Sequence, residues 1–96
     1  MSDDVDILVG RQLRRRRRLL GLTQQQVATL VGVRFQQIQK YECASNRMSV
    51  NMLWRLASVL DVEVGYFFAG ARRHGEIDHA AEPALIRSLA SYDRAA

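Results

Sequence analysis

The sequence has a single cysteine, Cys43, so an internal disulfide is excluded. One thiol fits a reducing compartment, and we expect a cytoplasmic protein in which Cys43 is inert. Redox sensing by this thiol is the alternative. No apolar run approaches the roughly 18 residues of a bilayer-spanning segment, and there is no signal-peptide core. We therefore expect no membrane partner and no export.

Residues that carry chemistry are also scarce. Neither of the two histidines, His74 and His79, has a cysteine or spaced carboxylates around it, so we expect no metal site. We find no nucleophile–base set, no paired carboxylates and no catalytic phosphate loop. A chain of 96 residues forms one domain with a small tail. A domain of that size buries only about 60–65% of its unfolded surface. The sequence therefore predicts neither an enzyme nor a cofactor.

Acidic residues are almost missing from the middle of the chain. Between residues 10 and 60 there are ten lysines and arginines but one acid, Glu42, whereas residues 71–96 carry four charges of each sign. A basic segment beside a neutral one is typical of a polyanion-binding protein. The alternative is a basic surface without a ligand.

Residues 22–42, LTQQQVATLVGVRFQQIQKYE, predict two short helices joined by a tight turn. Thr23 and Gln26 fit a capping box at the start of the first helix. Gly32 supplies the positive φ that ends it, and the second helix follows over 34–42. The expected packing positions are Val27, Ala28, Leu30 and Val31 in the first helix, with Val33, Ile38 and Tyr41 in and beside the second.

The other side chains of the second helix can read bases. They are Arg34, Phe35, Gln36, Gln39 and Lys40. Glutamine bonds adenine through two atoms, lysine donates to guanine, and an aromatic ring rests on a thymine methyl. We expect this helix to enter the major groove of double-stranded DNA. A solvated surface is the bland alternative, and for Phe35 the alternative is packing back on the core.

The segments TQQQVATLVGV and FQQIQKYE, the latter soon followed by NR, resemble the Cro/phage-repressor (Xre-like) helix-turn-helix family. The resemblance covers residues 9–68. It implies an all-α fold, a five-helix repressor-like DNA-binding domain, with the five side chains above at base-contact positions. It also implies DNA phosphate contacts by Gln24, Asn46 and Arg47, although Asn46 could instead be a turn residue. In the family the end of this domain often forms a dimer interface.

Two positions depart from the family pattern. Arg34 stands where a serine or threonine often caps the recognition helix, and a lost cap costs about 1 kcal/mol. Ala44 stands where glycine often follows that helix. A left-handed alanine costs on the order of 1 kcal/mol, so a different loop shape is expected there.

A helix is expected over 4–20, ended by Gly21, with Val5, Leu8, Val9, Leu13 and Leu20 on its inner face. The arginine run 14–18 covers more than one turn, so its members cannot all face DNA. Arg14, Arg15 and Arg18 are the candidates near phosphates, with Arg14 the one assigned to a phosphate contact, and most of the run is expected to be solvated. Arg17 resembles the family arginine that pairs with Glu42, with DNA contact as its alternative. Nuclear localisation or nonspecific RNA binding is a further interpretation of the run, and the surrounding apolar pattern argues against it.

Ser49 is a natural N-cap for a helix over 50–60, whose core positions are Leu53, Leu56, Ala57 and Leu60. Trp54 lies off that stripe and either covers the core edge, which we favour, or joins a dimer contact. A fifth helix is expected over 63–68, with Phe67 in the core. Trp54, Tyr66 and Phe68 are the candidates for exposed dimer contacts.

Residues 71–96 are expected to form a linker and an amphipathic C-terminal helix over 83–94, following a DNA-binding domain over 1–70. Leu85, Ile86, Leu89 and Tyr92 share one face of that helix. It is too short to be stable alone. A second subunit is the favoured docking partner; its own domain and another protein are the alternatives.

These features predict a sequence-specific transcriptional regulator, most simply a repressor that binds a pseudo-palindromic operator as a homodimer. Its recognition helices would lie about 34 Å apart. The first alternative is the antitoxin of a toxin–antitoxin pair with autoregulatory DNA binding. The second is an interaction module that has lost DNA binding.

Overall fold

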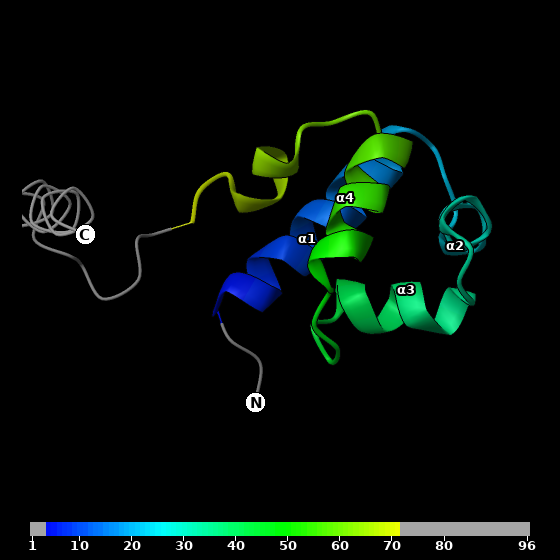
Figure 1. The fold of residues 1–96 in the computed structure, drawn as a ribbon, viewed down its shortest axis with the longest axis horizontal. Coiled ribbons are helices and arrows are strands. Elements are labelled where there is room, and N and C mark those ends of the chain that lie inside the picture. The colour runs from blue at the N-terminus through cyan, green and yellow to red at the C-terminus, as the bar shows by residue number, and fades with distance from the viewer. Residues whose placement is uncertain (1–3, 72–96) are drawn as a thin grey trace, which may run out of the picture.

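Four α-helices and one short 3-10 helix make up the computed structural model, which describes residues 4–71 (Figure 1). They are α1 (Asp4–Leu19), α2 (Gln24–Val31), α3 (Phe35–Glu42), α4 (Val50–Val59) and η1 (Val64–Phe68). No strand occurs among these residues, as the all-α prediction requires. The fifth helix expected over 63–68 is a 3-10 helix, so the count of five α-helices is not confirmed. Residues 64–68 are too few for a stable α-helix, and they close i→i+3 bonds typical of short connectors.

Helix α1 begins with Asp4 and Asp6 in its first turn, where acidic groups favour the positive end of the helix dipole. Gly21, at φ 72°, lies in the turn that follows it. Val9 and Leu13 are buried, as expected, but Leu20 is 42% exposed. Leu20 was assigned to the inner face by helical spacing, and that spacing no longer applies because α1 ends at Leu19.

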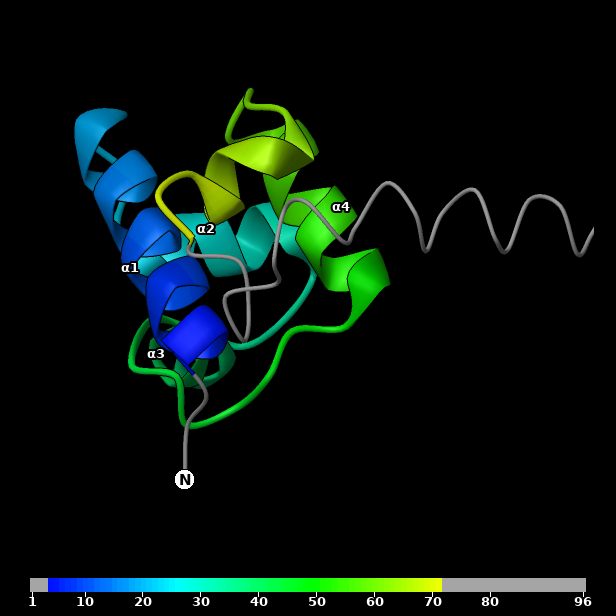
Figure 2. The same ribbon diagram turned by 90° about the vertical axis from the view of Figure 1, so that its left-hand side faces the viewer.

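The turn between α2 and α3 has the predicted chemistry. The Thr23 hydroxyl accepts from the Gln26 amide, and the Gln26 side chain accepts from the Thr23 amide, at 3.0 and 2.8 Å. Gly32 adopts φ 77°, and the following Val33 N–H donates to the Ala28 carbonyl at 3.0 Å. The turn thus sets α3 across α2 in both views (Figures 1 and 2).

Leu30 is a correction to the expected stripe of α2. Val27, Ala28 and Val31 are buried, but Leu30 is 57% exposed. Helix α2 packs on α3 and α4, and those two partners cover only the Val27–Val31 side. Leu30 lies on the flank of that side and borders a shallow surface hollow with Leu22.

Helix α4 starts at the predicted cap, where the Ser49 hydroxyl accepts from the Met52 amide at 3.0 Å. Leu56, Ala57 and Leu60 are buried, and Met52, which sequence reasoning missed, joins them. Trp54 is 67% exposed, so the favoured interpretation of this ring as core cover was wrong.

The core draws on every element. Its fully buried side chains include Leu13, Val27, Val31, Ile38, Leu56, Leu60 and Phe67. Phe67 brings η1 against α1 and α4, as the prediction of a core phenylalanine requires. Within residues 4–71 no helix is long and apolar enough to cross a bilayer.

The C-terminal predictions lie outside the described residues. They concern the linker, His74 and His79, and the helix over 83–94 with Leu85, Leu89 and Tyr92. The division between residues 70 and 71 likewise stays a prediction. In the described part of the chain no three histidine, cysteine or acidic side chains lie close enough to share a metal ion.

Candidate nucleic-acid interface

Helix α3 has one face in the core and one face in solvent. Ile38 is fully buried and Tyr41 is 8% exposed. The five side chains expected to read bases all lie on the exposed part of the helix or at its start: Arg34, Phe35, Gln36, Gln39 and Lys40. Phe35 is 38% exposed and does not belong to the core cluster, so it does not fold back as its alternative required.

The polar members of this set have no side-chain partner in the described part of the chain. Among residues 4–71, the side chains of Arg34, Gln36, Gln39 and Lys40 make no hydrogen bond or ion pair. Arg34 occupies the N-cap of α3 without a side-chain capping bond, as its departure from the family pattern suggested. Their donors and acceptors are therefore available to a ligand.

A buried ion pair fixes α3 against the rest of the domain. Arg17 Nε and a terminal guanidinium nitrogen donate to the two carboxylate oxygens of Glu42, at 2.6 and 3.0 Å. The other terminal nitrogen donates to the Leu22 carbonyl at 2.9 Å. Gln24 Nε2 donates to Glu42 Oε1 at 3.1 Å. One carboxylate thus ties together α1, α2 and α3.

The pair is nearly closed to water, with side chains 11% and 5% exposed for Arg17 and Glu42. The hydrogen bond that Arg17 donates to Glu42 raises the pKa of Arg17 in spite of its burial. Both side chains of the pair therefore stabilise the fold and are not available to a ligand. Gln24, expected at a phosphate, is bonded to Glu42 in the protein without DNA.

Gly10 makes a close contact that the sequence did not reveal. A Cβ at this position would lie 2.4 Å from the Tyr41 carbonyl oxygen and 2.8 Å from that of Glu42. Both atoms belong to the backbone at the end of α3, so only glycine allows α1 to lie this near. Gly10 and Arg17, two turns apart on α1, together position α3.

The loop after α3 does take the left-handed turn for which glycine is usual. Ala44 adopts φ 61°, and the Ser45 amide donates to the Lys40 carbonyl at 2.9 Å. The expected change of loop shape is therefore not seen.

Cys43 is exposed at the end of the helix, and a hydrogen bond with the Ser45 hydroxyl lowers the pKa of its thiol.

The two phosphate candidates of this loop differ in their contacts. Asn46 is exposed, with no side-chain hydrogen bond to a described residue. Arg47 Nε lies 2.9 Å from Asp6 Oδ2, in an ion pair whose arginine is 74% exposed. Arg47 therefore faces solvent while it is held by an acid from the first turn of α1.

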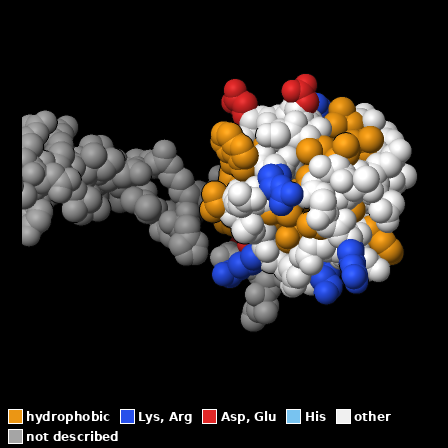
Figure 3. All heavy atoms as spheres, turned by 45° about the vertical axis from the view of Figure 1, so that its right-hand side comes forward, with side chains coloured by type: hydrophobic (Ala, Val, Ile, Leu, Met, Phe, Trp, Pro, Cys, Tyr) orange, Lys and Arg blue, Asp and Glu red, His pale blue; other side chains and the backbone are white. Residues whose placement is uncertain are grey.

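The side chains of the arginine run of α1 point in different directions, some toward the protein and some toward solvent. Arg16 Nε donates to the Leu60 carbonyl at 2.8 Å and so caps the C-terminal end of α4. Arg14, Arg15 and Arg18 are exposed. Figure 3 shows lysine and arginine side chains in the middle and along the lower part of one face, the lower part being where Figure 1 places α3, with acidic side chains at the upper edge.

The candidates for dimer contacts in the described part of the chain differ in exposure. Trp54 and Phe68 are 67% and 39% exposed. Tyr66 was expected to be exposed, but it is half-buried. Its ring meets the Phe67 ring edge-on, with 5.8 Å between the ring centroids. Val50, missed from the sequence, is 86% exposed and lies one turn before Trp54 on α4.

Comparison with known proteins agrees with this geometry. The helix-turn-helix family HTH_3 matches residues 13–67. An uncharacterized HTH-type transcriptional regulator of Sinorhizobium medicae is 41% identical over 71 residues, which are 74% of this chain and 51% of that protein. An uncharacterized transcriptional regulator in the ATPase CF(0) region of Rhodospirillum rubrum is 46% identical over 69 residues, 72% of this chain and 64% of that one. The chain spans about half the length of several curated relatives.

Solved structures resemble the domain as well. The restriction-modification controller protein C.AhdI of Aeromonas hydrophila superposes with a TM-score of 0.63 at 28% identity, over 66% of this chain and 96% of that one. An HTH_3 family transcriptional regulator of Vibrio cholerae superposes with a TM-score of 0.65 at 28% identity, over 72% of this chain and 40% of that one.

Proposed function

Because this chain belongs to the HTH_3 helix-turn-helix family, whose members are DNA-binding transcriptional regulators, we propose that it represses transcription by binding a pseudo-palindromic operator as a homodimer. Such a regulator acts by occupying DNA, and it needs no catalytic site. Two copies related by a two-fold axis would place their α3 helices in successive major grooves, about 34 Å apart.

The observation that carries the proposal is the state of the exposed face of α3. Gln36, Gln39 and Lys40 have donors and acceptors with no partner among the described residues, on a helix whose position is fixed by Glu42. Preorganised polar groups of this kind are the ones that discriminate base edges. Arg34 and Phe35, at the start of the helix, complete the proposed reading surface.

We assign the contacts with the DNA backbone to residues around α3. Asn46 and Arg14 are exposed and would meet phosphates directly. Gln24 and Arg47 would do so by exchange, since each is bonded to a carboxylate, Glu42 or Asp6, in the free protein. Phosphate contacts set the register of the protein on the duplex and carry no sequence information themselves.

The dimer surface is assigned to the exposed apolar side chains of α4 and η1. Val50 lies one turn before Trp54 on α4, and Val50 also lines a hollow with Phe68. All three side chains are exposed, and a monomer would leave them in water. Leu85, Leu89 and Tyr92 would extend the contact to the second subunit or to a protein partner.

Selection of bound duplexes from a random-sequence pool tests the proposal. Two inverted half-sites at a fixed spacing are the expected result. A single half-site would contradict the homodimer. No enrichment, with salt-sensitive binding to any duplex retained, would contradict sequence reading. No salt-sensitive binding to any duplex would favour an interaction module that has lost DNA binding.

Gln36→Ala then tests base reading by α3. We expect a loss of about 1–3 kcal/mol on the selected operator and relaxed preference at one base position. Gln25→Ala is the matched control, because it removes the same exposed amide from the neighbouring helix α2. An equal loss on operator and unrelated duplexes, measured by fluorescence anisotropy, would contradict the base contact.

A further inference from the structure

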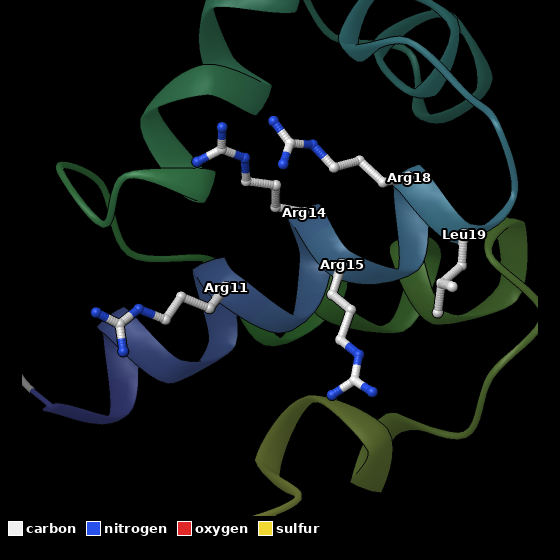
Figure 4. A pocket seen from close by; sticks show the side chains of 5 residues that line it. All are labelled: Arg11, Arg14, Arg15, Arg18 and Leu19. Atoms are coloured by element: carbon white, nitrogen blue, oxygen red, sulfur yellow. The ribbon is translucent and has the colours of Figure 1, made fainter.

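Four arginines on the outer side of α1 have no counter-charge among residues 4–71. They are Arg11, Arg14, Arg15 and Arg18, and together with Leu19 they line a shallow surface hollow (Figure 4). All four are exposed, and none makes a hydrogen bond or ion pair with another described residue. Asp6 and Glu42 are already paired with other arginines, since Asp6 holds Arg47 and Glu42 holds Arg17.

This arrangement disfavours the helix that carries it. Arg11 lies three and four residues before Arg14 and Arg15, and Arg18 follows them at four and three. Like charges at these spacings repel each other across one turn. Among the described residues nothing relieves this repulsive cluster, and an anionic ligand with several charges would do so.

The cluster divides according to which neighbour it faces. Figure 4 shows Arg14 and Arg18 projecting on the side of α1 toward α3 and α2, while Arg15 and Leu19 project on the other side, toward η1. Arg14 lies three residues before Arg17 on α1, and Arg18 directly follows it. Arg17 donates a hydrogen bond to Glu42 at the end of α3. Gly10 holds the same stretch of α1 directly against that end.

We propose that Arg14 and Arg18 form a rail for the phosphate backbone of the duplex that α3 reads, extending the contact onto DNA that flanks the recognised bases. The inference rests on the proposed function and adds Arg18 to it, while Arg15 stays outside the contact. Guanidinium groups bind phosphate oxygens through two parallel hydrogen bonds. Because α3 occupies the groove, α1 meets the backbone and reads no bases.

The test compares two charge-matched double variants of the full chain. Arg14→Gln with Arg18→Gln removes the rail, and Arg11→Gln with Arg15→Gln removes two charges from the same helix. Each variant leaves one of the four repulsive pairs, so their effects on α1 are alike. Binding to the selected operator and to an unrelated duplex is measured by fluorescence anisotropy over a salt series, with thermal unfolding as the check on folding.

We expect loss of the rail to reduce the slope of log affinity against log salt by about 2, because about 0.9 counterions are released for each phosphate contact. The advantage of the unmodified protein over that variant should shrink about tenfold between roughly 50 and 200 mM salt, equally on both duplexes. The Arg11 and Arg15 variant should keep the original slope.

Equal slopes for the two variants would overturn the proposal, because diffuse charge would then explain the binding. A loss confined to the operator would also overturn it, in favour of base reading by α1. Failure of the proposed function looks different: the unmodified protein would then bind both duplexes alike.

Discussion

Replacing Glu42 with alanine removes the acceptor at which α1, α2 and α3 converge. The carboxylate accepts two hydrogen bonds from Arg17, at 2.6 and 3.0 Å, and one from Gln24 at 3.1 Å. Alanine leaves the Leu22 carbonyl as the one acceptor of the Arg17 guanidinium among the described residues. A nearly buried charge would then be left without a counter-charge.

The magnitude follows from the burial of that charge. Glu42 raises the pKa of Arg17, and a guanidinium does not lose its proton near neutral pH even without that partner. Removing one partner of a buried ion pair costs about 3–5 kcal/mol, and small domains have a total stability of only about 5–15 kcal/mol. We expect the lower end of the first range, because Arg17 keeps the Leu22 carbonyl and is 11% exposed.

Urea unfolding followed by far-UV circular dichroism measures the loss. Gln24→Ala is the control, since it removes one neutral donor and should cost about 1 kcal/mol or less. Arg17→Met combined with Glu42→Leu removes both charges and should be more stable than Glu42→Ala alone. A loss below about 1 kcal/mol for Glu42→Ala, the range of a surface ion pair, would refute the reasoning.

Three further changes test the scaffold and the loop. Gly10→Ala should lower the free energy of unfolding by about 1–3 kcal/mol, because its Cβ meets backbone of α3; a higher melting temperature would contradict this close contact. Ser49→Ala should cost about 1 kcal/mol in the same assay, through the lost cap of α4. Asp6→Asn should release Arg47 and strengthen binding to any duplex by up to about fivefold, whereas Asp4→Asn, equal in charge change, should do less.

Local signals in the sequence were sufficient to predict the helix-turn-helix. The Thr23–Gln26 capping box, Gly32 and the Ser49 cap are each set by residues within one turn of chain, and each is present in the structure. The buried positions Ile38 and Phe67 follow from helical spacing and side-chain size in the same way. The family match over residues 13–67 agrees with this prediction.

Predictions failed where the outcome depended on what a helix packs against. Leu30 has the spacing of a core residue, yet the partners of α2 leave its side uncovered. Trp54 has the size of a core residue, but it lies on the outer side of α4, 67% exposed. Hydrophobicity and periodicity identify apolar stripes, but they do not tell how wide a stripe the neighbouring elements will cover.

Contacts between distant segments were beyond prediction for another reason. Gln12 donates to the Tyr66 carbonyl 54 residues away, and Arg16 reaches the Leu60 carbonyl 44 residues away. Side chain to backbone bonds of this kind leave no mark in the sequence, because any residue supplies the carbonyl. The need for glycine at position 10 is hidden likewise, since it arises only when α3 lies against α1.

The arginine run shows why net charge is a poor count of DNA contacts. Successive residues of a helix point about 100° apart, so neighbours in sequence meet different surroundings. Arg16 meets the end of α4, Arg17 meets Glu42, and Arg18 meets solvent. Two of these three charges therefore stabilise the fold, and only the third is free to bind a phosphate. Of the ten lysines and arginines between residues 10 and 60, the number available to DNA is set by the direction of each side chain and by the acids and carbonyls that it meets.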